Sequence, residues 1–167
     1  MIDKATRDRA GFTIVELIVV IAIVAIVGTA SLISLSLVSG QNIKSCYKEL
    51  EGYIQETKMR AMSRKNNPSM TIYKGSDGAV YVSLSDTGEN IRIGKAGLTV
   101  QYSTPTGTYE ISGTQKLQIG FERSTGAFNK VTNPSGTNEY CNSIIISDGS
   151  RTYTMKLVPK TGKYYRE

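Results

Sequence analysis

The chain has 167 residues, enough for about one domain, and a formal net charge of +6. It contains no histidine, no tryptophan and two cysteines. This composition excludes a Ser-His-Asp or Cys-His catalytic site, a His-ligated metal and a Cys/His zinc cluster. We therefore expect no metal, no cofactor and no enzymatic activity.

The most apolar part of the sequence lies near its N-terminus. Residues from Phe12 to Val38 are mostly Ile, Val, Leu and Ala, and Glu16 is their one charged side chain. As a helix this segment would be about 40 Å long, which is enough to cross a bilayer. The alternative is a helix buried in a soluble domain, but one domain has too little protein to surround it. We predict a transmembrane or filament-core helix over residues 12–39.

A short polar segment, residues 1–11, precedes the apolar one. It carries Lys4, Arg7 and Arg9 against two aspartates. Basic residues beside a first membrane span hold that end in the cytoplasm. The sequence therefore predicts a single-pass membrane protein with a cytoplasmic N-terminus and an exported C-terminal domain.

The junction between these segments reads Arg9-Ala10-Gly11-Phe12-Thr13-Ile14-Val15-Glu16-Leu17-Ile18. A polar leader ending in Gly, then Phe, then Glu four residues later and a long apolar helix resembles the type IV prepilin family, which includes pilins and type II secretion pseudopilins. The resemblance implies that a membrane prepilin peptidase cuts between Gly11 and Phe12 and methylates the new Phe12 amine. Residues 1–11 would be the leader, and the apolar helix would stay in the mature protein.

Glu16 is unusual because a carboxylate inside a membrane segment costs about 2.5–3.5 kcal/mol on insertion scales. Cleavage would create an ammonium group on Phe12, and opposite charges attract strongly in a low dielectric. The resemblance and this argument both suggest that Glu16 of one subunit pairs with the Phe12 amine of its neighbour during assembly. The alternative is that Glu16 favours the positive end of the helix and reaches the membrane interface.

A polar, amphipathic stretch over residues 40–66 continues the apolar segment without a proline. Its less polar residues recur in steps of four and three, which places them on one helix face: Ile43, Tyr47, Leu50, Ile54, Thr57 and Ala61. Asn66-Asn67-Pro68 predicts the end of the helix. We predict a stem helix that packs on a sheet.

From Ser69 onward, short alternating runs are separated by turn signals. Predicted strands cover Met70–Lys74, Ala79–Leu84, Leu98–Tyr102, Tyr109–Ser112, Lys116–Phe121, Ala127–Val131, Ser143–Ser147, Thr152–Val158 and Lys163–Tyr165. Thr132–Asn142 is too polar for a strand and is predicted to be a long loop. Short connections favour antiparallel hairpins. The predicted fold class is α+β: a long N-terminal helix packed on an antiparallel β-sheet or small β-sandwich formed by residues 69–167.

The C-terminal part of the sequence is similar to H-type minor pseudopilins and related minor pilins. The similarity is carried by Met59-Arg60-Ala61-Met62-Ser63-Arg64, Leu117-Gln118-Ile119-Gly120-Phe121, Gly126, Ile144-Ile145-Ile146, Gly149, Tyr153-Thr154-Met155-Lys156-Leu157 and Thr161-Gly162-Lys163. It implies a minor subunit of a pilus or secretion filament.

Cys46 lies on the predicted stem helix and Cys141 near the end of the predicted loop. An exported domain permits a disulfide, which would pin the loop to the helix and stabilise the fold by about 4–5 kcal/mol. We favour this bridge, because two lone cysteines in an exported module seldom stay unpaired. The alternative is two buried free thiols that pack like small apolar side chains.

The C-terminal tail is basic and aromatic. Its members are Arg151, Lys156, Lys160, Lys163, Tyr164, Tyr165 and Arg166. Basic side chains among aromatic ones can contact phosphates and stack on bases, so DNA is one candidate partner. The alternative is a solvated edge strand protected by lysines, which we consider the better interpretation.

Three functions remain after these steps. The first is a structural subunit, a minor pilin or pseudopilin whose partners are other such subunits, the prepilin peptidase and, before assembly, the membrane. The second is the same anchored fold with DNA or a surface ligand bound by the basic tail. The third is a membrane-anchored enzyme, which the missing histidines and scattered carboxylates disfavour.

Overall fold

The computed structural model describes residues 13–63 and 66–167, with the backbone alone for residues 27–40. The chain divides into two units, Met1–Val38 and Ser39–Glu167. Helix α1 (Ile14–Ser63) contributes to both units, and all strands belong to the second.

The first residues of α1 form a recognisable cap. The Oγ1 atom of Thr13 accepts a hydrogen bond from the backbone N–H of Glu16 at 3.2 Å. The Thr13 carbonyl also accepts the N–H of Leu17 at 3.1 Å. Thr13 is therefore the N-cap of the helix, and Thr-x-x-Glu is the capping-box pattern that places an acid in the first turn.

The second half of α1 packs as its periodicity predicts. All six residues of the predicted stripe are at most 5% exposed: Ile43, Tyr47, Leu50, Ile54, Thr57 and Ala61. Cys46 lies on the same face and is fully buried. The predicted stem face is confirmed, because residues three and four apart share one side of a helix.

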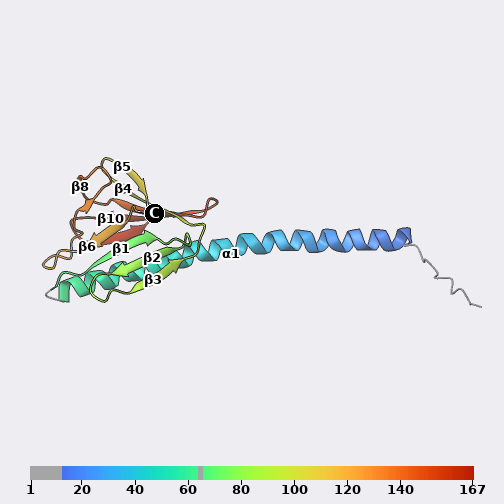
Figure 1. Ribbon diagram of the computed structural model, residues 1–167, viewed down its shortest axis with the longest axis horizontal. Coiled ribbons are helices and arrows are strands. Elements are labelled where there is room, and N and C mark those ends of the chain that lie inside the picture. Colours follow the sequence, from blue (N-terminus) through green and yellow to red (C-terminus); the bar gives the residue numbers. More distant parts are fainter. Residues whose placement is uncertain (1–12, 64–65) are drawn as a thin grey trace, which may run out of the picture. The chain divides into compact units, whose positions relative to one another are not determined.

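The β-structure consists of two larger antiparallel sheets and a small hairpin (Figure 1). One sheet has the order β3-β2-β1-β6, from Asn90–Gly94, Val80–Leu84, Ser69–Lys74 and Leu117–Gly120. The other has the order β11-β10-β9-β4-β5, from Lys163–Arg166, Thr152–Val158, Ser143–Ser147, Thr99–Thr104 and Gly107–Glu110. The hairpin pairs β7 (Val131–Thr132) with β8 (Asn138–Glu139).

One hydrophobic cluster joins the stem half of α1 to both sheets. Leu50 and Ile54 from the helix, Ile72 from β1 and Tyr102 and Ile144 from β4 and β9 all belong to it. Buried and partly buried side chains alternate along β1, β2 and β4, so each sheet buries one face. The predicted α+β class, a helix packed on antiparallel sheets, is confirmed.

One strand prediction and one loop prediction were wrong, and one strand outside those segments was missed. Ala127–Val131 does not form one strand: Phe128 makes an isolated bridge with Phe121, its N–H donates a hydrogen bond to the Pro159 carbonyl, and only Val131 lies in a strand. The predicted loop Thr132–Asn142 contains the turn of the β7–β8 hairpin and the whole of β8. The missed strand is β3, whose short Ile-Arg-Ile alternation forms a sheet edge.

The β7–β8 hairpin exists because Asn133 closes its turn. The Asn133 side-chain oxygen accepts the N–H of Thr137 at 2.8 Å, and its carbonyl accepts the N–H of Gly136. Gly136 has a φ of +79°, a conformation that glycine adopts without strain. Side-chain turn chemistry of this kind allows a polar segment to form a hairpin.

Candidate functional site

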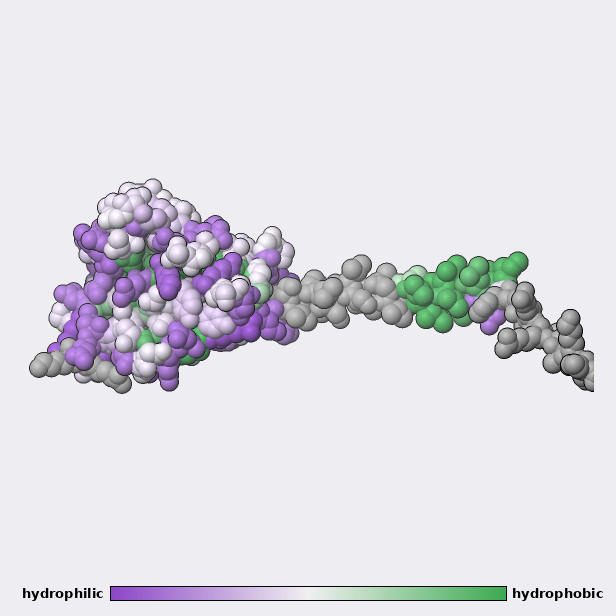
Figure 2. All heavy atoms as spheres, in the orientation of Figure 1, coloured by the Kyte–Doolittle hydropathy of each residue, from purple (hydrophilic) through white to green (hydrophobic). Residues whose placement is uncertain are grey.

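The start of α1 exposes a large apolar surface. Every described side chain from Thr13 to Ile26 is exposed, and the large apolar ones range from 49% exposed at Val20 to 78% at Ile14 (Figure 2). Contiguous apolar surface of this extent on a helix marks a site of protein–protein or membrane contact. The exposed segment is therefore the strongest candidate for a functional site.

Glu16 is the one charged residue of this segment. Its side chain is exposed, and its backbone N–H is held by the Thr13 cap. An acid in the first turn interacts favourably with the positive end of the helix dipole. The arrangement leaves the carboxylate itself available to a partner outside the helix.

Thr13 was not among the site residues predicted from the sequence. Its signal was present, because Thr-x-x-Glu directly before an apolar run is a capping box. The cap fixes where the helix begins and hence that Glu16 lies in its first turn.

The predicted processing residues Gly11 and Phe12 lie outside the described residues, as does the predicted leader 1–11. The predicted span over residues 12–39 extends into side chains that are also outside them. Among the side chains that the structure describes, no helical segment is long and apolar enough to cross a membrane.

The structure has Cys46 and Cys141 as buried free thiols, so it does not contain the bridge that we favoured. Each thiol has its own neighbours. The Cys46 sulfur lies against Gly94, at the end of β3. A Cβ atom added to that glycine would lie only 2.9 Å from the sulfur. The Cys141 thiol donates to the Ser143 carbonyl at 3.5 Å, at the start of β9.

The residues of the predicted basic tail lie on and between two strands at one edge of the five-stranded sheet. Lys156 lies in β10, Lys160 in the following turn, and β11 carries the last four: Lys163, Tyr164, Tyr165 and Arg166. Arg151 directly precedes β10. The Tyr164 hydroxyl reaches back to the helix and donates to the Glu51 carbonyl at 3.5 Å.

Two of the tail cations are also engaged inside the chain. The Lys156 ammonium lies 3.3 Å from a carboxylate oxygen of Glu167. The Arg166 guanidinium lies 4.4 Å from the ring centroid of Tyr153. These contacts agree with an edge strand whose charges serve the fold, and the tail does not form one uninterrupted basic surface.

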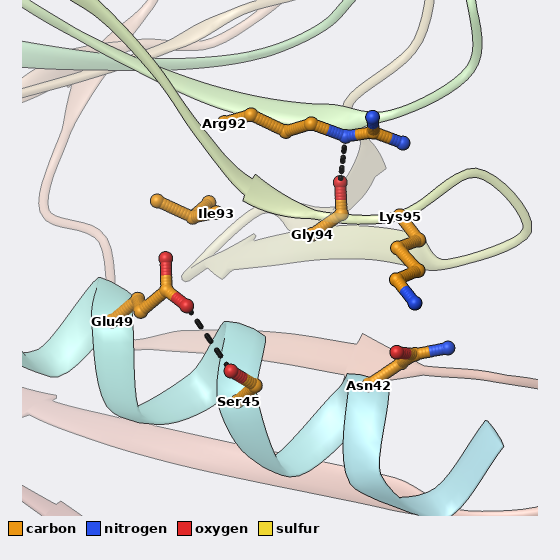
Figure 3. A pocket seen from close by; sticks show the side chains of 7 residues that line it. All are labelled: Asn42, Ser45, Glu49, Arg92, Ile93, Gly94 and Lys95. Carbon is orange, nitrogen blue, oxygen red and sulfur yellow. Dashed lines mark hydrogen bonds between the residues drawn. The ribbon is translucent and has the colours of Figure 1, made fainter. Parts of the chain in front are cut away.

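A cleft of about 240 Å³ lies between the beginning of the stem and β3 (Figure 3). On the helix side, the Ser45 hydroxyl donates a hydrogen bond to the Glu49 carboxylate at 3.1 Å. On the strand side, the Arg92 Nε–H donates a hydrogen bond to the Gly94 carbonyl at 3.4 Å. Lys95 extends from the strand side toward the helix. The cleft combines one carboxylate with two cations, and its polar groups are partly satisfied by one another.

Comparison with known proteins gives one match. The family described as "Prokaryotic N-terminal methylation motif" matches residues 6–38, which include the Gly-Phe junction, the Thr13 cap and Glu16. No curated protein and no solved structure matches the sequence significantly. The chain therefore carries a type IV prepilin-like N-terminal methylation motif at the start of the helix that exposes its apolar surface.

Proposed function

We propose that the chain is a pilin-like structural subunit. Prepilin peptidase cleaves it after Gly11 and methylates Phe12, and the retained helix then joins it to other pilin or pseudopilin subunits. The observation that carries this proposal is the methylation motif at residues 6–38, continuous with an exposed apolar helix. In this role the N-terminus is anchored in the membrane before assembly.

The exposed carboxylate of Glu16 gives the assembly its register. Packing the apolar surfaces of several helices together removes Glu16 from water. In the buried interior that results, an unpaired charge is destabilising by about 3–5 kcal/mol. The Phe12 ammonium of a neighbouring subunit neutralises it. Only one axial arrangement of the helices brings these two groups together.

The finer proposal is a minor subunit without enzymatic activity, placed at the tip of the filament or in its initiation. It is supported by the similarity of the strand and glycine pattern to H-type minor pseudopilins and by the absence of histidine from the sequence. Internal contacts of Tyr164, Lys156 and Arg166 give no support to the DNA-binding alternative through the tail.

The decisive experiment is mass spectrometry of the chain from cells with and without the peptidase. We expect the mature chain to lack Met1–Gly11 and to carry one extra methyl group on Phe12. In cells without the peptidase the full chain should remain. A chain that keeps its first eleven residues in the presence of the peptidase would contradict the proposal.

The assembly role of Glu16 is tested by Glu16→Gln, which leaves the neighbour's ammonium unpaired. We expect at least about a tenfold loss of the subunit from sheared filaments, since about 1.4 kcal/mol corresponds to a factor of ten. The control is Glu110→Gln, an exposed carboxylate on β5 with the same charge change. Equal filament recovery from the two variants would refute the pairing, even if cleavage and methylation were confirmed.

A further inference from the structure

The outer face of the four-stranded sheet, on the side away from the core, carries an ordered set of polar side chains. Strand pairing places Tyr73 of β1 opposite Tyr81 of β2, and Tyr81 opposite Arg92 of β3. The Lys116 ammonium lies 5.2 Å from the ring centroid of Tyr73, on the other side. The first row across this face is therefore cation, tyrosine, tyrosine, cation.

The two tyrosine rings in this row contact each other and their neighbours. Tyr73 and Tyr81 stack on each other, with ring centroids 5.5 Å apart and planes at 19°. Lys116 lies over the Tyr73 ring, and the Tyr81 hydroxyl donates to Asp77 at 2.9 Å. The Tyr73 ring is thus contacted by both Tyr81 and Lys116, so the row does not offer a series of free aromatic faces on which successive bases could stack.

The second row consists of uncharged hydrogen-bonding groups. Thr71 of β1 lies opposite Gln118 of β6 and Ser83 of β2, and Ser83 lies opposite Asn90 of β3. The side-chain oxygen of Asn90 accepts a hydrogen bond from the Tyr73 hydroxyl at 3.0 Å. The amide N–H groups of Asn90 can then bind a ligand. Neighbouring strands are about 4.8 Å apart, so the row offers regularly spaced partners.

A cleft of about 570 Å³ continues this face beyond the edge strand β6. Lys116, Gln118 and Thr71 line one side, and Asn129, Lys130 and Thr132 line the other. The lining contains no carboxylate. Neither lysine forms an ion pair with a carboxylate within the described part of the chain. The volume lies in the range of small-ligand sites.

We propose that this face and its cleft bind an acidic oligosaccharide, a chain of sugars that bear carboxylate or sulfate groups. Lys116 and Lys130 attract the acidic groups, and the amides and hydroxyls of the second row bind the sugar hydroxyls. A simple anion would use only the lysines, and a single-stranded nucleic acid would need several free ring faces in succession. This binding goes beyond the structural role and does not depend on cleavage or assembly.

The test is titration calorimetry of the full-length chain in neutral detergent with a linear hexamer of galacturonate. We expect saturable binding that weakens as salt is added. Lys116→Gln with Lys130→Gln should weaken it at least about tenfold, because each substitution removes a hydrogen bond to a charged group. Lys130→Gln alone should weaken it in the same direction.

The matched control is the double variant Lys160→Gln with Lys163→Gln, two exposed lysines at the β10–β11 turn. It makes the same charge change and should alter the affinity by less than about twofold. Maltohexaose, which is neutral, and hexathymidylate, which is a nucleic acid of similar charge, should bind at least about tenfold more weakly. No saturable binding, an equal loss in the two double variants, or equal affinity for either comparison ligand would overturn the proposal.

Discussion

Cys46 and Cys141 each occupy an environment that holds the thiol protonated. Burial raises the pKa of the Cys46 thiol to about 12, and the charge of nearby Glu49 acts in the same direction. Burial also raises the pKa of the Cys141 thiol to about 12, against a smaller opposite effect of the hydrogen bond to Ser143. A thiol reacts as its thiolate, so both cysteines should be inert in the folded protein.

Alkylation at pH 8.5 tests this prediction. About half of an unfolded cysteine population is ionised at that pH, whereas a group with a pKa near 12 is almost fully protonated. We expect iodoacetamide to modify Cys46 and Cys141 at least about a hundredfold more slowly in the folded chain than in urea without reductant. Ser124→Cys, in an exposed turn, provides a fast-reacting control.

The mass of the urea-treated sample also distinguishes the two interpretations of the cysteines. Two alkyl groups added without reductant would agree with the free thiols of the structure. Alkylation that requires a reductant would instead restore the bridge suggested by the sequence.

At the scale of elements, the stem half of α1 is held by one buried stripe. Ile54 is fully buried in the shared cluster, whereas its neighbour Gln55 is exposed. The stripe was predictable because helical periodicity is a local property of the sequence. Strand β3 was not predictable in this way, because a short edge strand forms only when a neighbouring strand, here β2, provides its hydrogen-bonding partners.

Ile54→Ala tests whether this stripe stabilises the second unit. The substitution leaves a cavity in the cluster and should lower the free energy of unfolding by about 2–5 kcal/mol. Gln55→Ala, one residue along the helix, should change it by less than about 0.5 kcal/mol. Urea denaturation of the full chain followed by near-ultraviolet circular dichroism measures both. Similar midpoints for the two variants would contradict the packing of the stem.

At the scale of the whole second unit, three segments distant in sequence meet near the end of α1. The Lys58 ammonium donates to the Gly162 carbonyl at 2.9 Å in the β10–β11 turn. A Cβ atom at Gly162 would lie 1.7 Å from the carbonyl oxygen of Gly126. The helix, the turn before Phe128 and the C-terminal turn therefore close on one another through a glycine that has no room for a side chain.

Gly162→Ala should disrupt this closure. Its φ of +60° strains any other residue, and the added methyl group overlaps backbone that cannot move aside cheaply. We expect a loss of at least about 3 kcal/mol in the free energy of unfolding. Gly136→Ala is the matched control, because Gly136 also has a positive φ but faces open space. It should lose only about 1–2 kcal/mol, and equal losses would show that contact with Gly126 is unimportant.

Features that depend on local pattern could be predicted from the sequence. The N-terminal motif with Gly11, Phe12 and Glu16, the buried stripe of the stem and the α+β class all follow from spacing and periodicity over short windows. The capping role of Thr13 was equally readable. Long-range packing set the order of strands in the two sheets, the separate surroundings of Cys46 and Cys141, and the internal contacts of the basic tail. It also decided which polar side chains share the outer face of the four-stranded sheet. These features depend on pairing between residues far apart in the chain, and the energy that selects one pairing comes from burying the whole core together.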